Sequence, residues 1–284
     1  APFLWAKKGG SWQSISWAET AQQVASFAQS LKDIGMEPGD RVMLVSENRP
    51  EWFIADLGIM AAGCVTVPTY TTNTERDHQH IIEDAGASAI VVSTNKLAQS
   101  VMPAALRATR AHHLIGIEEL RVGQSTGVAI HSWDAMVGKA ADVDACAAAA
   151  TFKREDLACL IYTSGTGGAP RGVMQHHGAI LCNVAGAAEV LIEDFGIADE
   201  RFLSFLPLSH AYEHSGGQYL PIGVGAEIFY SEGLEKLASN IEETRPTIMV
   251  VVPRLFEVLR TRIMKQVEKQ GRVANYMMDA AMKI

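Results

Sequence analysis

Apolar and polar positions along the first hundred residues alternate between helical spacing and short continuous apolar runs. Between residues 18 and 34, Val24, Ala28 and Leu31 fall on one helical face, and Gly35 fits the end of that helix. A turn at residues 37–40 then leads into an apolar run. Runs of this kind follow each predicted helix, which is typical of strands buried on both faces.

The predicted elements follow one another as strand, helix, strand. Pro50 begins a helix that ends near Gly63, and a capping box at Thr74 and Asp77 begins another that ends at Gly86. Successive units of this kind imply a parallel sheet. The predicted strands of this half cover residues 41–46, 64–67, 89–93 and 114–117.

The second half repeats the alternation after an alanine-rich run at residues 140–150, which we interpret as a connector between subdomains 1–150 and 151–284. Here the predicted strands are 157–161, 201–206 and 247–252, and the predicted helices are 179–195, 233–244 and an amphipathic one from Pro253. The chain is therefore expected to be an α/β protein with mostly parallel sheets flanked by helices.

Composition narrows the class of protein. The 284 residues are 48% hydrophobic and 20% charged, with a net charge of −8, which argues against a nucleic-acid partner. The four cysteines have no CxxC spacing, so we expect free thiols in a reducing compartment. No run of about 18 apolar residues occurs, so no transmembrane segment is predicted.

One glycine-rich stretch carries the candidate chemistry. Residues 162–173 read YTSGTGGAPRGV, between a predicted strand and a helix expected from near His176. Small residues at a strand–loop–helix junction present backbone N–H groups to an anion. Thr163, Ser164 and Thr166 add hydroxyl donors, and Arg171 adds a cation suited to phosphate oxygens. The glycines of the stretch are Gly165, Gly167, Gly168 and Gly172.

Two common phosphate motifs do not fit this stretch. The Walker pattern GxxxxGK followed by Ser or Thr does not occur, and GxGxxG fails because Pro170 stands three residues after Gly167. A surface hairpin is the simple alternative, but a hairpin rarely requires a proline and a cation at fixed places. We therefore interpret the stretch as a loop that holds a polyphosphate.

The stretch resembles the phosphate loop of the adenylate-forming superfamily, Tyr-Thr-Ser-Gly-Thr-Thr-Gly-x-Pro-Lys-Gly-Val, which includes acyl-CoA synthetases. It departs from that pattern at Gly167, usually Thr, and at Arg171, usually Lys. The segments at residues 15–19 and 62–68 match further elements of the family. The segments at residues 206–214, 245–247 and 252–254 favour its long-chain acyl-CoA synthetase branch.

The resemblance implies roles for individual residues. The loop residues Thr163, Ser164, Gly165, Thr166, Gly167, Gly168 and Arg171 would hold the phosphates of ATP, and Thr163 would also help to hold Mg²⁺. His210 and Arg171 would be catalytic, with His210 bonding the carboxylate or phosphate during adenylation. His214 lies close to the position of an aromatic gate of the fatty-acid tunnel. The alternative for His210 is a capping or core histidine at a strand–helix turn.

The function implied is the ATP-binding part of a long-chain fatty-acid–CoA ligase. Such an enzyme forms acyl-AMP and then acyl-CoA, with ATP, Mg²⁺, coenzyme A and a fatty acid as cofactors and substrates. Two alternatives stay open, a fatty-acyl-AMP ligase that loads a carrier protein and a non-catalytic nucleotide- or lipid-binding module. The resemblance further implies a cytoplasmic protein with peripheral membrane contact, and a homodimer.

The later motifs of that family do not occur after residue 252. They are a Tyr-Gly-x-Thr-Glu run, an Asp that holds the ribose, a hinge and a C-terminal Lys. The sequence is accordingly expected to be the first half of a longer chain. Alone, it should form no detectable acyl-AMP.

Overall fold

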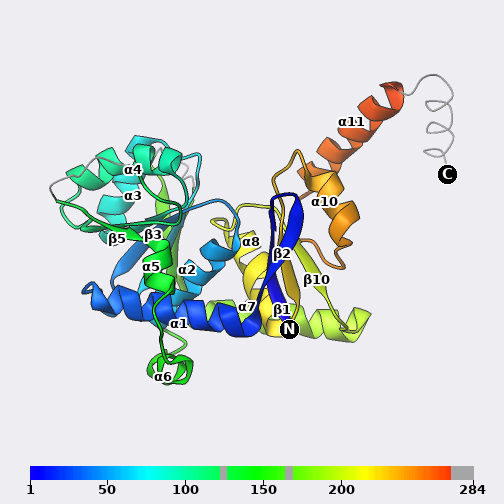
Figure 1. Cartoon of the computed structure of the whole chain (residues 1–284). Coiled ribbons are helices and arrows are strands. Elements are labelled where there is room, and N and C mark those ends of the chain that lie inside the picture. Colours follow the sequence, from blue (N-terminus) through cyan, green and yellow to red (C-terminus); the bar gives the residue numbers. More distant parts are fainter. Residues whose placement is uncertain (122–126, 164–168, 270–284) are drawn as a thin grey trace. The chain divides into compact units, whose positions relative to one another are not determined.

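The computed structural model describes residues 1–121, 127–163 and 169–269 of the chain. Contacts divide it into two units, Ala1–Met249 and Val250–Ile284. The first unit holds two sheets with the helices that cover them (Figure 1). In the second unit, the structure describes one helix, α11 (Pro253–Lys269).

The larger sheet has seven strands in the order β7-β6-β5-β3-β4-β8-β9. Every neighbouring pair is parallel except β8 and β9, which are antiparallel. On each side of β3 the strands follow one another in chain order, as successive βαβ units produce. Each crossover returns the chain to the end of the sheet where the previous strand began, so that the next strand runs parallel to it. The strands are β3 (Arg41–Val45), β4 (Val65–Thr69), β5 (Ala87–Val92), β6 (His113–Gly116), β7 (Ala129–Ser132), β8 (Leu157–Thr163) and β9 (Arg171–His176).

Helices cover both faces of this sheet, as the continuous apolar runs predict. Along β3, Val42 and Leu44 join one buried cluster, whereas Met43 and Val45 join another. Successive side chains of a strand point to opposite faces, so both faces of β3 are buried. The first cluster lies against α1 (Trp17–Asp33), α2 (Pro50–Ala61) and α5 (Trp133–Val137), and the second against α3 (Glu75–Ala85) and α4 (Asn95–Arg107).

The smaller sheet joins the two ends of the first unit. Its order is β10-β11-β1-β2, and only β1 and β2 are antiparallel. The strands are β1 (Pro2–Lys8), β2 (Ser11–Ser16), β10 (Arg201–Ser204) and β11 (Glu227–Tyr230). The remaining helices are α6 (Val143–Ala149), α7 (His177–Phe195), α8 (Ala211–Glu213), the π-helix η1 (His214–Tyr219), α9 (Leu220–Val224) and α10 (Leu237–Thr244). The predicted α/β class with mostly parallel sheets is confirmed.

The boundary at residue 150 stays a prediction, and each sheet takes strands from both sides of it. Two further expectations need correction. The alanine-rich run contains a helix, α6, whose first turn is capped by the Asp142 carboxylate. The stretch 247–252 makes only an isolated bridge, between Ile248 and Phe202, instead of a full strand.

The glycine stretch ends in a strand, β9, which begins at Arg171 and separates the loop from the helix that was expected to follow it. Strand β9 pairs with β8 along its whole length, from Leu157 opposite His176 to Thr163 opposite Arg171. Helix α7 then begins at His177, close to the predicted start. The prediction missed β9 because its valine and methionine lie on an exposed edge strand and show no apolar alternation.

Among the residues that the structure describes, no helix combines the length and the apolar character needed to cross a bilayer.

Candidate active site

A cavity of about 570 Å³ opens where parallel strands of the larger sheet end. Its lining combines Thr69 and Tyr70 at the end of β4, Tyr162 and Thr163 at the end of β8, and His210 before α8. Pockets beyond the carboxyl ends of parallel strands are the usual ligand sites of α/β folds. Further lining residues are Thr72, Asn73, Asp77, Ile81 and Pro170.

The strands around this cavity separate just before it. The pairing between β4 and β8 is limited to Thr66 and Cys159. Two residues later, β4 carries Pro68, which has no N–H to donate to a neighbouring strand. The ends of β4 and β8 therefore offer side chains to the cavity in place of further sheet.

The base of the glycine stretch is fixed by its neighbours in the sheet and in α3. The Tyr162 hydroxyl donates to Asp84 over 2.6 Å, and a His80 ring nitrogen lies 2.9 Å from the carbonyl oxygen of Pro170. Burial, then the bond to Asp84, raises the pKa of Tyr162, which keeps the hydroxyl protonated as a donor. A Cβ at Gly172 would lie 3.0 Å from the Tyr162 ring, so this glycine allows the two strands to approach.

Thr163 and Arg171 stand opposite each other where the described part of this hairpin ends. Thr163 lines the cavity, whereas the exposed Arg171 is not among its lining residues. The other phosphate-binding candidates lie outside the described residues. They are Ser164, Gly165, Thr166, Gly167 and Gly168.

His210 caps the helix that follows it, the alternative that the sequence left open. Its Nδ1 accepts a hydrogen bond from the N–H of Tyr212 over 3.2 Å. In a neutral imidazole, an accepting Nδ1 leaves the proton on Nε2. The exposed ring thus has a donor available while it lines the same cavity as Thr163.

His214 occupies a different environment from His210. Its backbone N–H donates to the carbonyl of His210 over 2.9 Å, so the two are one helical turn apart. Its side chain is only 1% exposed, and its Nε2 lies 2.9 Å from a carboxylate oxygen of Asp56 on α2. The structure therefore does not bring His210 and His214 into one pocket.

Asp56 is the centre of a buried polar cluster between α2 and η1. Besides His214, its Oδ2 accepts hydrogen bonds from Gln218 Nε2 at 2.5 Å and from the Tyr219 hydroxyl at 2.7 Å. Burial acts to raise the pKa of Asp56, but attraction to His214 and the hydrogen bonds outweigh it and the pKa is lowered. The carboxylate therefore organises the π-helix around a negative charge.

Glu213 is also buried, next to η1 in the sequence, but its pKa is shifted in the opposite direction from that of Asp56. The Ser204 hydroxyl donates to Glu213 Oε1 over 2.7 Å, and Oε2 has no hydrogen-bond partner among the residues that the structure describes. Burial raises the pKa of Glu213 to about 8, against the opposing effects of the Ser204 bond and of the Phe205 backbone. A Cβ at Gly217 would lie 2.4 Å from Oε1, so the carboxyl group occupies the space over that glycine.

The sequence reasoning missed several of these residues. Tyr70 and Thr72 lie in the loop after the predicted strand 64–67, and loops that follow parallel strands usually face the ligand site. Asp56 stands within the run WFIADLGIM, where a charged residue in an apolar helix indicates a buried, paired group. Asn48 and Glu213 carried no comparable pattern.

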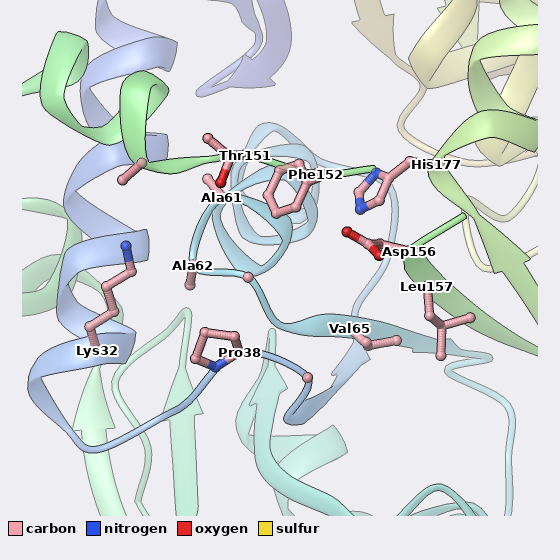
Figure 2. A pocket seen from close by; sticks show the side chains of 13 residues that line it. Lys32, Pro38, Ala61, Ala62, Val65, Thr151, Phe152, Asp156, Leu157 and His177 are labelled. Atoms are coloured by element: carbon pink, nitrogen blue, oxygen red, sulfur yellow. The ribbon is translucent and has the colours of Figure 1, made fainter. Parts of the chain in front are cut away.

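Another cavity lies at the opposite ends of the strands. It has a volume of about 530 Å³ and is bordered by Val65 and Leu157, where β4 and β8 begin. Figure 2 shows Phe152 beside His177, and their rings stack with centroids 4.6 Å apart. Lys32 lies on another wall of this cavity. It contains none of the site residues predicted from the sequence.

Metal binding by protein side chains alone is not indicated in the described ranges. Within residues 1–121, 127–163 and 169–269, no group of three or more His, Cys, Asp or Glu side chains is arranged to hold an ion.

Comparison with known proteins places this geometry in a family. The chain is 28% identical over 276 residues to a human long-chain-fatty-acid–CoA ligase, which covers 94% of this chain and 40% of the relative. It is 31% identical over 259 residues to a long-chain-fatty-acid–CoA ligase of Mycobacterium tuberculosis, covering 87% of this chain and 40% of the relative. The chain thus spans about 40% of the length of these curated relatives.

Solved structures agree with the sequence relatives. A benzoate CoA ligase from Burkholderia xenovorans superposes with a TM-score of 0.72 at 26% identity, covering 90% of this chain and 48% of that one. The family model described as AMP-binding enzyme matches residues 2–281, nearly the whole chain. With its parallel sheets and the cavity at their carboxyl ends, the chain belongs to the AMP-binding enzyme family.

Proposed function

We propose that this chain is the ATP-binding part of a long-chain fatty-acid–CoA ligase, which activates a fatty acid as acyl-AMP and transfers the acyl group to coenzyme A. The observation that carries the proposal is that Thr163 and His210 line one cavity. Thr163 comes from the glycine stretch at the end of β8 in the larger sheet, and His210 comes from the segment 206–214, which follows β10 of the smaller sheet.

The residues around the cavity fit a nucleoside triphosphate such as ATP. Its volume of about 570 Å³ suits a ligand of that size. Thr163 offers a hydroxyl at the cavity wall, and Arg171 opposite it supplies a cation for phosphate oxygens. Mg²⁺ is usually held by one or two carboxylates together with substrate phosphates and waters, so the Thr163 hydroxyl would supply one ligand among several. ATP supplies the adenylyl group when bound.

The protein's part in this reaction is to position and neutralise. Phosphoryl chemistry needs little covalent help from side chains, mainly alignment and charge compensation. The Nε2–H of His210 can donate to an oxygen of the fatty-acid carboxylate or of the α-phosphate. Because Tyr162 is bound to Asp84, Thr163 next to it is held in place at the strand end. Together these groups would bring the carboxylate and the phosphate to one point.

Replacing Arg171 by Ala should raise the KM for ATP by roughly 10- to 100-fold, the loss of one charge-assisted contact. The measurement is fatty-acid-dependent exchange of pyrophosphate into ATP by the full-length protein. Arg171→Lys should retain most activity, since the charge persists. Arg110→Ala is the matched control, because this exposed arginine lies between α4 and β6 and not on the hairpin that carries Thr163. Unchanged ATP kinetics in Arg171→Ala would remove Arg171 from the site.

Replacing His210 by Ala should lower turnover by roughly 10- to 100-fold with every fatty acid, because the lost donor serves the carboxylate and phosphate instead of the acyl chain. A panel of acids from short to long chain length checks this. His112→Ala removes an exposed histidine elsewhere and serves as the control. A loss that depends on chain length would place His210 in the acyl pocket instead.

The position of His214 close to the gate of the fatty-acid tunnel, which the resemblance implies, would make this residue a determinant of acyl-chain length. Because its ring is buried on Asp56, any effect on specificity must act through the packing of η1.

Pyrophosphate exchange that depends on the fatty acid also separates an enzyme from a non-catalytic binding module. The identity of the acceptor, coenzyme A or a carrier protein, is decided by supplying each to the enzyme with acyl-AMP and measuring which one takes the acyl group as AMP is released.

A further inference from the structure

Asn48 connects the two sheets at their carboxyl ends. It lies between β3 of the larger sheet and α2, and its Nδ2 donates to the Ser204 hydroxyl at the end of β10 over 3.0 Å. The same Nδ2 donates to the carbonyl of Leu206 over 2.6 Å, and its Oδ1 accepts from the N–H of Leu208 over 3.0 Å. One amide group therefore clamps the backbone on both sides of Pro207.

The clamped turn leads directly to His210. The carbonyl of Pro207 accepts the backbone N–H of His210 over 2.9 Å. Downstream, the Ser204 hydroxyl that Asn48 bonds donates in turn to Glu213 at the end of α8. The segment that carries His210 is thus fastened to the end of β3 before the histidine and, through Ser204, after it.

This connection matters because the cavity is built from both sheets. Thr163 belongs to β8 of the larger sheet, whereas His210 follows β10 of the smaller one. The separation between the two side chains depends on how the end of β10 is held against the end of β3. Asn48 itself lines a neighbouring cavity of about 440 Å³ that shares Tyr70 and Thr72 with the first.

We infer that Asn48 is a positioning residue, which sets the place of His210 opposite Thr163 through the turn at Pro207. The inference rests on the proposed function, because it concerns the adenylation step that His210 would serve. An asparagine is needed for this task since it offers two donors and an acceptor on one planar group. An aspartate keeps the acceptor for Leu208 but has no donor for Leu206, and an alanine keeps neither.

The test is a double-mutant cycle in the full-length protein, assayed by fatty-acid-dependent pyrophosphate exchange. It compares Asn48→Ala, His210→Ala and the double variant. We expect Asn48→Ala to lower kcat roughly 10- to 100-fold, the cost of misplacing a reacting group, with the KM for ATP changed less than about twofold. The double variant should be no slower than the slower single variant within about twofold, because both changes remove the same contribution.

Asn95→Ala is the matched control. Its side chain also clamps a loop, donating to the Glu119 carbonyl over 2.7 Å and accepting from the Arg121 N–H over 2.5 Å, but it lines neither of the two cavities described above. It should leave kcat unchanged. Asn48→Asp, which keeps one of the three bonds, should lose part of the turnover and should likewise add nothing to His210→Ala.

Each outcome decides whether Asn48 positions His210 for the reaction or only stabilises the fold. Losses that multiply in the double variant, or a kcat for Asn48→Ala equal to that of Asn95→Ala, would overturn the inference. Failure of both Asn48 variants to fold, seen by circular dichroism, would also overturn it, because Asn48 would then serve the fold alone. Absence of exchange in the wild type would overturn the proposed function itself, a result that is distinguishable from all of these.

Discussion

Replacing Asp56 by Ala is expected to lower the free energy of unfolding by about 3–5 kcal/mol, the usual cost of removing one partner from a buried charged cluster. Three side chains of η1, namely His214, Gln218 and Tyr219, share the Asp56 carboxylate as their acceptor. Without it, His214 and Gln218 lose the carboxylate that they bond and Tyr219 keeps only a weak contact to the Met60 sulfur, while all three side chains are at most 9% exposed. The measurement is the shift of the urea unfolding midpoint of the full-length protein.

The sign of the pH dependence gives a second check on Asp56. Its pKa in the folded chain is lower than in the unfolded chain. The stability it contributes is therefore present in full above its unfolded pKa, about 3.9, and is lost as the pH falls through the lower folded pKa. The difference in unfolding free energy between wild type and Asp56→Ala should accordingly shrink in strong acid, as the pH falls through the folded pKa of Asp56.

Asp33→Ala is the control for this prediction. Asp33 pairs with Lys139 over 2.9 Å on the surface, where both side chains are about half exposed. Such a pair contributes about 0–1 kcal/mol, so the variant should unfold close to the wild-type midpoint. An Asp56→Ala variant as stable as Asp33→Ala would show that the cluster around η1 contributes nothing to the fold.

The strands and helices of the parallel core could be predicted because the apolar runs and helix caps that specify them lie within each segment. Strand β3 is apolar on both faces, and the helices beside it begin at ordinary caps, such as the Thr74 and Asp77 capping box found at α3. Pro50 begins α2, as the sequence indicates. These features do not depend on distant parts of the chain, so residue patterns alone identify them.

Elements that depend on distant partners were not predicted. Strand β1 pairs with β11, more than two hundred residues away, and its sequence PFLWAKK has no alternation that specifies a strand. The same applies to β9, which is defined by β8 beside it. Conversely, the apolar stretch at 247–252 has strand composition but pairs only through Ile248. Strand propensity describes a fit to neighbours, so it cannot specify pairing by itself.

The candidate site divides along the same line. Thr163 and His210 were named from motifs, and the structure places both on one cavity. The residues that position Thr163 and His210 were not predicted, because they come from elements that meet only when the two sheets pack together. Asn48 reaches the turn before His210 across 158 or more positions of sequence, a relation that no local pattern contains.

The remaining large effect concerns Glu213, whose carboxyl group is the counterpart of Asp56. The folded chain holds its proton up to about pH 8, because the group is 1% exposed and burial disfavours the charge. The unfolded chain releases that proton near pH 4.3. Since the folded pKa is the higher one, the stability linked to this proton is present in full below pH 4.3 and is lost as the pH rises toward 8.

Replacing Glu213 by Gln should therefore stabilise the protein increasingly with pH, because an amide has nothing to ionise. The difference in unfolding free energy from wild type should be small at pH 5 and reach about 3–5 kcal/mol in favour of Glu213→Gln at pH 9. Urea unfolding of both proteins across this range measures it, and Glu189→Gln on the exposed side of α7 should follow the wild-type profile. Parallel profiles for wild type and Glu213→Gln would mean that the carboxyl group is already ionised in the folded chain. The Ser204 bond and the polar groups around η1 would then have to stabilise a second buried negative charge next to Asp56, which the orphaned Oε2 of Glu213 argues against.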